Sequence, residues 1–215
     1  MSRPEAHFVR YLIELILGYG LILCALWTPE FPQNLLSPIA LIVTLAVVLA
    51  YRPTLDELGL GRRGLTASLW ILPAALALAV VSVLVAKGLG TLHSLYQGDL
   101  KHIAGYVLWT LYQQCLLNDY FMPRLARVLP SESAAVGIAA ALFASAHLPN
   151  PWLSVATLVW GGVSCALFLR YRNLYTLGLA QGLLGLCFAI CVPDALHHHL
   201  RVGLGYLRYH GTPVP

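Results

Sequence analysis

The chain has 215 residues, of which 59% are hydrophobic and 10% are Asp, Glu, Lys or Arg, and its mean hydropathy is +0.73. A soluble domain carries about 25% charged residues, so this composition excludes a soluble fold and favours a protein whose solvent is largely lipid. The net charge of +4 comes without a long basic run, so nucleic acid is not an expected partner.

Apolar runs near 20 residues predict an all-α bundle of about seven transmembrane helices, forming one membrane-embedded domain over residues 1–215. In chain order, the predicted spans cover residues 8–27, 35–51, 65–85, 103–122, 134–147, 152–169 and 174–192. The segment PSES carries cap residues before the fifth span, and the turn PNP follows it. The polar and aromatic tail, 193–215, is expected at the membrane interface.

The distribution of Lys and Arg between loops predicts how the chain crosses the membrane. With seven spans, the loops on the side of the N-terminus hold nine Lys and Arg, and those on the other side hold four. Because cytoplasmic loops carry the excess of basic residues, the N-terminus is predicted in the cytoplasm and the tail outside. A small multi-span protein with this loop bias suits a bacterial inner membrane.

Polar side chains within the predicted spans form a candidate functional site, because such residues usually face the interior of a bundle. They are Gln113, Gln114, Asn118 and Asp119 in the fourth span, His147 in the fifth and Gln181 in the seventh. Gln114 and Asn118 are four residues apart and are expected to share a helix face. The alternative is that the amides only join helices, with Gly178 and Gly182 as packing positions.

These segments resemble, in their order and over about residues 55–190, the CPBP family of membrane proteases, which includes the CAAX prenyl proteases and bacterial Abi proteins. The family has Glu-Glu-x-x-x-Arg on one helix, then Phe-x-x-x-His, then His-x-x-x-Asn. Here QQCLLNDYFMPRL stands where the family reads something like EELLFRGFLLPRL, FASAHLPNP stands at the second motif, and NLYTLGLAQGLLGL stands at the third.

The departures from these motifs replace every charged or titratable position of the first and third with a neutral one. Gln113 and Gln114 stand for the two glutamates and Asn118 for the arginine, while Gln181 and Gly185 stand for the third motif's histidine and asparagine. Only Phe143 and His147 keep the pattern. The resemblance implies glutamates that activate a water for attack on a peptide carbonyl, and glutamine cannot act as that general base. The site is therefore predicted to be a neutral polar pocket.

Two further groups could supply chemistry in place of the glutamates. Asp119 is the one acid inside the fourth span, and it could act as an acid or base or could pair with Arg124 or Arg127 at the surface. The tail holds His197, His198 and His199, which are ligand types for zinc or iron.

The predicted topology puts His147, His102, Asp194 and the three tail histidines on the outer side. His147 and the run His197–His199 are therefore candidate metal ligands, and a bound metal could activate water. The same histidines, with Arg201, could instead bind an anionic headgroup or carboxylate. The alternative is an interfacial tail without chemistry, as its tyrosines would suggest.

The leading hypothesis for function is an intramembrane hydrolase-like enzyme acting on a membrane peptide or a lipid-linked substrate. His147 would carry the chemistry, with Gln113 and Asp119 beside it in the site. Gln114, Asn118 and Gln181 would orient the substrate or hold an oxyanion. Residues expected to contact the substrate are Phe143, Gly185 and Arg201. The alternative is a non-catalytic relative that binds a lipid or prenyl group, or a partner's transmembrane helix.

Overall fold

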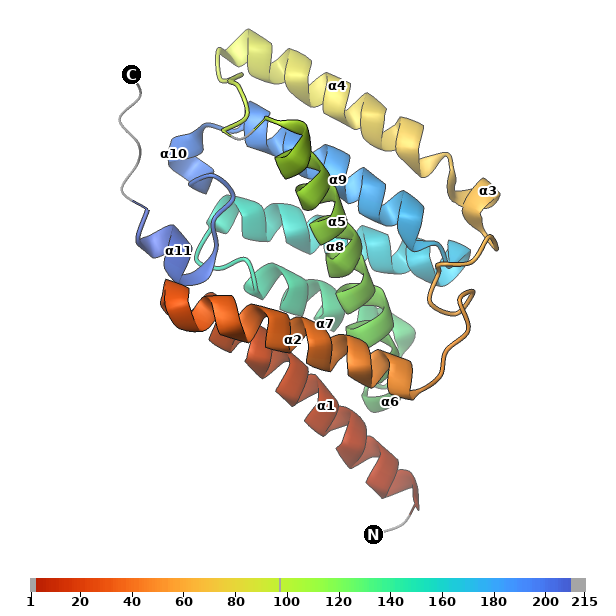
Figure 1. The fold of residues 1–215 in the computed structure, drawn as a ribbon. Helices are drawn as coiled ribbons and strands as arrows, with labels where there is room; N and C mark the ends of the chain where they lie inside the picture. The colour runs from red at the N-terminus through yellow and green to blue at the C-terminus, as the bar shows by residue number, and fades with distance from the viewer. Residues whose placement is uncertain (1–2, 97, 210–215) are drawn as a thin grey trace. The chain divides into compact units, whose positions relative to one another are not determined.

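The computed structural model describes residues 3–96 and 98–209, and every regular element within those ranges is a helix (Figure 1). Five helical segments are long and apolar enough to cross a bilayer: His7–Leu26, Glu30–Ala50, Leu65–Leu89, Pro151–Tyr171 and Leu174–Cys191. A further apolar helix, α7 (Glu132–Ser145), is shorter at 14 residues. The prediction of a polytopic helical membrane protein is therefore confirmed. Its insertion direction and the bacterial inner membrane stay predictions.

The two other predicted spans differ from regular transmembrane α-helices. The fourth coincides with three successive helical segments: α5 (Leu100–Cys115), the π-helix η1 (Leu116–Phe121) and α6 (Met122–Val128). The fifth coincides with α7, whose length of about 21 Å is less than the bilayer core. The sequence predicted a regular α-helix throughout the fourth span. The structure instead has a π-helix at Leu116–Phe121, within that span.

The chain forms two compact units, each built from separate stretches of sequence. Unit one comprises residues up to 53, 116–166 and 202–208; unit two comprises 54–115, 167–201 and the stretch from 209. Unit one holds η1, α6, α7, most of α8 (Pro151–Tyr171), and also α1 (Arg3–Leu26), α2 (Glu30–Ala50) and α11 (Gly203–Leu207). Unit two holds α5, α3 (Leu65–Ser68), α4 (Ile71–Leu89), α9 (Leu174–Cys191) and α10 (Asp194–His197).

Short polar side chains start the helices that carry the candidate motifs. The Ser131 hydroxyl accepts the backbone N–H of Ala134 at 3.1 Å at the start of α7, as the PSES segment predicts. The Asn173 side chain likewise accepts the N–H of Thr176 at 3.1 Å at the start of α9. Each cap satisfies a donor that the first turn of a helix leaves open.

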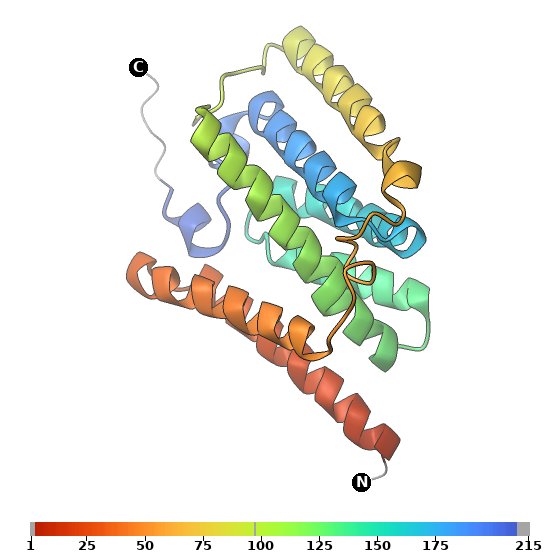
Figure 2. The ribbon, with the colours of Figure 1, turned by 45° about the vertical axis from the view of Figure 1, so that its right-hand side comes forward.

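In unit two, α9 packs against both α4 and α5 (Figure 2). Small residues allow the approach of α5: a Cβ on Gly178 would lie 2.3 Å from a Leu111 methyl carbon, and one on Gly182 would lie 3.3 Å from the Thr110 hydroxyl oxygen. The Thr110 hydroxyl donates to the carbonyl of Gly178 at 2.9 Å. The expectation that Gly178 and Gly182 are packing positions is confirmed.

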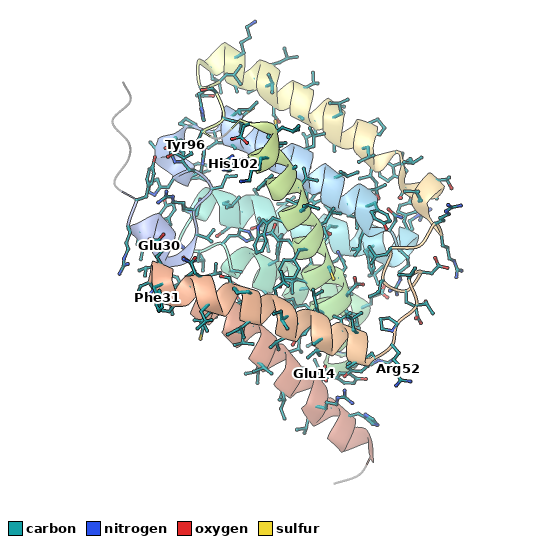
Figure 3. All side chains as sticks on the ribbon, viewed as in Figure 1. Glu14, Glu30, Phe31, Arg52, Tyr96 and His102 are labelled. Atoms are coloured by element: carbon teal, nitrogen blue, oxygen red, sulfur yellow. The ribbon has the colours of Figure 1, made fainter. Side chains whose placement is uncertain are left out.

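In unit one, a buried ionic network joins α1, α2 and α6. The Glu14 carboxylate on α1 accepts hydrogen bonds from Arg124 Nε at 2.7 Å, from the Tyr51 hydroxyl at 2.8 Å and from Arg10 Nε at 2.8 Å. Arg124 is only 4% exposed and Glu14 12%, whereas Arg10 is 54% exposed. Figure 3 shows Glu14 close to the end of α2, where Arg52 follows.

Arg124 also completes the backbone hydrogen bonding of the helix before it. In an α-helix, the carbonyl of Asp119 would accept the N–H of residue 123, but that residue is proline and has no N–H. Arg124 Nη1 supplies a donor instead, at 3.3 Å from the Asp119 carbonyl and 2.7 Å from the Tyr120 carbonyl. The Tyr120 hydroxyl in turn donates to the backbone carbonyl of Glu14. One arginine therefore ties the π-helix to α1.

We predict that Glu14→Gln lowers the free energy of unfolding by about 3–5 kcal/mol, because it leaves the buried Arg124 guanidinium without its counter-ion. The matched control is Arg10→Gln, which removes a half-exposed arginine from the same carboxylate. It should lower the free energy of unfolding far less, because solvent screens an exposed ion pair. Unfolding of both variants in lipid bicelles, followed by circular dichroism, measures the difference. Equal losses in the two variants would contradict a structural role for the buried pair.

Candidate functional site

Three glutamines of unit two form a continuous chain of side-chain amides. Gln114 Nε2 donates to Gln181 Oε1 at 2.5 Å, and Gln181 Nε2 donates to Gln113 Oε1 at 2.5 Å. Two of these residues come from α5 and one from α9, so the first and third candidate motifs meet through hydrogen bonds. The prediction that polar groups of these two segments gather inward is confirmed for this trio.

The amide chain carries no charge and is buried at Gln114 and Gln181, while Gln113 is half-buried. Gln114 is fully buried and Gln181 is 8% exposed. An amide satisfied by another amide avoids the large cost of burying an ionised group. The same hydrogen bonds restrict chemistry, because a glutamine amide does not accept a proton near neutral pH. The trio can orient a ligand or join the helices, and it cannot serve as a general base.

The second candidate motif lies in unit one, where His147 follows the end of α7. His147 Nδ1 lies 2.6 Å from the carbonyl oxygen of Phe143, and the two rings meet edge to face at 4.9 Å. Because a carbonyl only accepts, Nδ1 carries the hydrogen and the lone pair of the neutral ring is on Nε2. His147 is 8% exposed. Its Nε2 is the one ring nitrogen at a candidate motif position that has a lone pair to accept a proton.

The π-helix η1 holds Asn118 and Asp119, which are 1% and 8% exposed. The alternative that Asp119 lies at the surface is therefore wrong: burial in unit one keeps it from water. Arg124, offered as its surface partner, forms its ion pair with Glu14 and bonds the backbone carbonyl of Asp119. π-helical turns occur frequently at functional sites, and here one coincides with the end of the first motif.

The structure thus divides the predicted residues between the two units. Gln113, Gln114, Gln181 and Gly185 belong to unit two, while Asn118, Asp119, Phe143 and His147 belong to unit one. Gln114 lies in α5 and Asn118 in η1, so the expectation that they share a helix face stays a prediction.

The tail of unit two is held by hydrogen bonds to His197. This residue is 1% exposed. Its Nε2 donates to the carbonyl of Val192 at 2.9 Å, while Nδ1 accepts the N–H of Leu200 at 3.1 Å. Both ring nitrogens therefore serve the backbone, and burial lowers the pKa of His197 despite the Val192 hydrogen bond and the nearby Asp194 carboxylate.

A second tail cluster surrounds Asp194. The Tyr209 hydroxyl donates to Asp194 Oδ2 at 2.5 Å, and His199 Nε2 lies 3.1 Å from Oδ1. Tyr96 stacks on the His199 ring with centroids 3.9 Å apart. Burial lowers the pKa of His199 even though Asp194 opposes this. The Asp194 pKa is lowered as well, because the Tyr209 and His199 hydrogen bonds outweigh its burial.

The part of the chain that the structure describes contains no assembled set of metal ligands. No group of three or more His, Cys, Asp or Glu side chains there is placed to hold an ion. His197 is committed to backbone groups, and His102 lies against Asp99. Zinc or iron at His147 and the run His197–His199 stays a prediction. Arg201, the candidate anion ligand, packs over the Tyr209 ring at 5.2 Å.

Two features of the site were missed from sequence. The Glu14–Arg124 pair spans 110 positions, and the available signal was a glutamate inside an apolar span, which requires a partner. The second is Tyr106, whose hydroxyl lies where a side chain at Gly185 would project. Nothing in a single sequence indicates that Tyr106 contacts Gly185.

We predict that the tail loosens as the pH falls below about 6.5, the ordinary histidine value. Folding lowers the pKa values of His197 and His199, so their stabilising contribution is complete above that value and is lost on protonation. Protonated His197 also cannot accept the Leu200 N–H. Hydrogen exchange of residues 193–209, corrected for intrinsic rates, should show less protection at pH 5.5 than at pH 7.5.

A His197→Gln variant should lose most of this pH dependence, since its amide keeps a donor and an acceptor without titrating near neutral pH. The α9 backbone, compared in the same samples, should keep its protection at both pH values. Equal protection of the tail at both pH values in the unmodified protein would contradict the prediction.

The family model described as "Type II CAAX prenyl endopeptidase Rce1-like" matches residues 6–187 of this chain. No curated protein sequence and no solved structure matches it. The matched range starts well before residue 55, where the sequence resemblance was expected to begin, and so includes α1 and α2. The match confirms the CPBP resemblance and covers most of the chain: the protein belongs to the Rce1-like family of type II CAAX prenyl endopeptidases.

Proposed function

We propose that this member of the family binds a prenylated or similarly lipid-modified peptide within the bilayer and does not hydrolyse it. The ligand class follows from the family's description as prenyl endopeptidases, together with a chain that is itself membrane-embedded. A ligand of this kind combines an apolar chain with a few neutral polar groups. It would reach the protein laterally, through lipid.

The chain Gln114–Gln181–Gln113 carries the proposal. These residues stand at the glutamate and histidine positions of the family's motifs, and their amides are hydrogen-bonded to one another. A water held there would meet neutral groups with no capacity to take its proton near pH 7. The trio keeps hydrogen-bonding surface without charge, which suits a ligand with an apolar chain.

We predict that the purified protein in nanodiscs binds a fluorescent farnesylated CAAX peptide and leaves it intact. Binding would be measured by anisotropy, and release of the C-terminal tripeptide by mass spectrometry over several hours. The same peptide without its farnesyl group should bind at least tenfold more weakly, because burial of the prenyl chain supplies most of the affinity. The Gln113→Glu/Gln114→Glu double variant should also show no cleavage, since the arginine and second histidine of the motifs are still missing.

If the farnesylated peptide does not bind, the proposed class of ligand is wrong. If the unmodified protein releases the tripeptide over multiple turnovers, the proposal that it does not hydrolyse the peptide is wrong. That result would favour the second candidate function.

That second candidate is a hydrolase in which His147 is the base. The observation favouring it is the Nδ1 contact with the Phe143 carbonyl, which leaves the imidazole lone pair on Nε2. A histidine held in one tautomer by a backbone carbonyl is a frequent arrangement for general bases. The buried Asp119 and Asn118, in the same unit, would then orient the substrate or hold an oxyanion.

If the hydrolase exists, His147→Ala should lower the turnover number about 10²–10⁴-fold, the usual contribution of a general base. His102→Ala is the matched control, because His102 is exposed and lies against Asp99. Circular dichroism would verify that both variants fold. The binding proposal expects instead that His147→Ala changes peptide affinity less than threefold, so the two variants together separate the candidates.

A further inference from the structure

Gly185 lies directly against the phenol of Tyr106. A Cβ built on Gly185 would lie 2.0 Å from the Tyr106 hydroxyl oxygen and 2.9 Å from the ring carbon that bears it. Both residues belong to unit two, where α5 and α9 pack together. Gly185 stands at the position of the third motif's asparagine. The volume that an asparagine side chain would enter is therefore filled by the hydroxyl end of a tyrosine.

Tyr106 belongs to the same face of α5 as the amide chain. Tyr106, Thr110 and Gln114 follow at intervals of four residues, which places them along one side of the helix. Thr110 bonds the carbonyl of Gly178, and Gln114 bonds Gln181. This side of α5 thus presents a phenol hydroxyl, a threonine hydroxyl and an amide toward α9 in succession, over about 12 Å of helix axis.

Among these groups, the Tyr106 hydroxyl differs in having no protein partner. Within residues 3–96 and 98–209, no side chain or backbone group forms a hydrogen bond with it. The Thr110 hydroxyl and the glutamine amides are all engaged by the protein itself. Tyr106 is half-buried, and the hydroxyl of a tyrosine that is removed from water usually takes a hydrogen-bond partner.

We infer that the Tyr106 hydroxyl is a donor to the ligand, and that its acceptor is a neutral carbonyl oxygen beside the lipid-modified residue. The inference rests on the proposed binding function. A phenol donates one hydrogen bond without bringing charge, which matches an ester or amide carbonyl. Gly185 and Tyr106 then act together: the glycine provides the space and the tyrosine provides the donor.

Two probes that share the same prenyl chain test this assignment. N-acetyl-S-farnesyl-cysteine methyl ester carries amide and ester carbonyls, and S-farnesyl ethanethiol thioether carries none. Tyr106→Phe should weaken binding of the ester probe about tenfold and change binding of the thioether less than twofold. Tyr175→Phe, which removes a hydroxyl of α9 that bonds the Leu60 carbonyl, is the control and should change neither affinity.

A rescue variant and a melting curve complete the design. Tyr106→Leu/Gly185→Asn places an amide at the family's position and should regain ester affinity relative to Tyr106→Leu. The unliganded Tyr106→Phe protein should melt at or above the temperature of the unmodified protein, because the hydroxyl has no partner to lose.

The inference alone is overturned if Tyr106→Phe binds both probes as the unmodified protein does. Equal weakening of both probes, or a lower melting temperature without ligand, overturns it as well, because the hydroxyl would then serve only the fold. If the unmodified protein binds neither probe, the proposed function fails, and the inference that rests on it fails with it.

Discussion

An ionised side chain in a low-dielectric interior needs an opposite charge and a full set of hydrogen bonds, and this requirement organises the protein. Glu14 and Arg124 meet the charge requirement together and most of the hydrogen-bond requirement; Arg124 Nη2 is buried without a partner among the described residues. Each is mostly buried, and each brings further partners: the Tyr51 hydroxyl for the carboxylate, and the carbonyls of Asp119 and Tyr120 for the guanidinium. The pair therefore joins α1, α2 and α6, and it also supports the π-helix on which Asn118 and Asp119 lie.

The same requirement favours neutral groups at all the positions that the resemblance aligns with the motifs. A single glutamate among neutral groups would be a buried charge without a partner, at a cost of about 3–5 kcal/mol. The residues at those positions, Gln113, Gln114, Asn118 and Gln181, avoid that state. The resulting amides satisfy one another. Neutral substitution at every motif charge is thus physically consistent, whereas loss of one would not be.

Sequence reasoning succeeded where a local signal decides structure. Apolar runs located the long helices, and Ser131 predicted the start of α7 because its cap bond spans three residues. It failed where contacts are distant or geometry is unusual. The sequence around Glu14 carries no signal that Arg124 is its partner, and the segment LLNDYF carries no signal that distinguishes a π-helix from an α-helix. For the site, the inward gathering of Gln114 and Gln181 followed from polar residues within apolar spans, while the hydrogen bonds of His197 to backbone groups required coordinates.

Charged and neutral polar groups have different places in the chain. In unit one, the ionised Glu14 and Arg124 join helices, while in unit two Gln113, Gln114 and Gln181 form a neutral chain of amides. A site of the second kind can admit a prenyl chain without exposing a charge to it, and charge is what most opposes burial of an apolar ligand. Such a site would distinguish its ligands by their neutral hydrogen-bond acceptors, such as carbonyl oxygens. Tyr106 is suited to this, because its hydroxyl is the donor on that face of α5 that the described residues leave uncommitted.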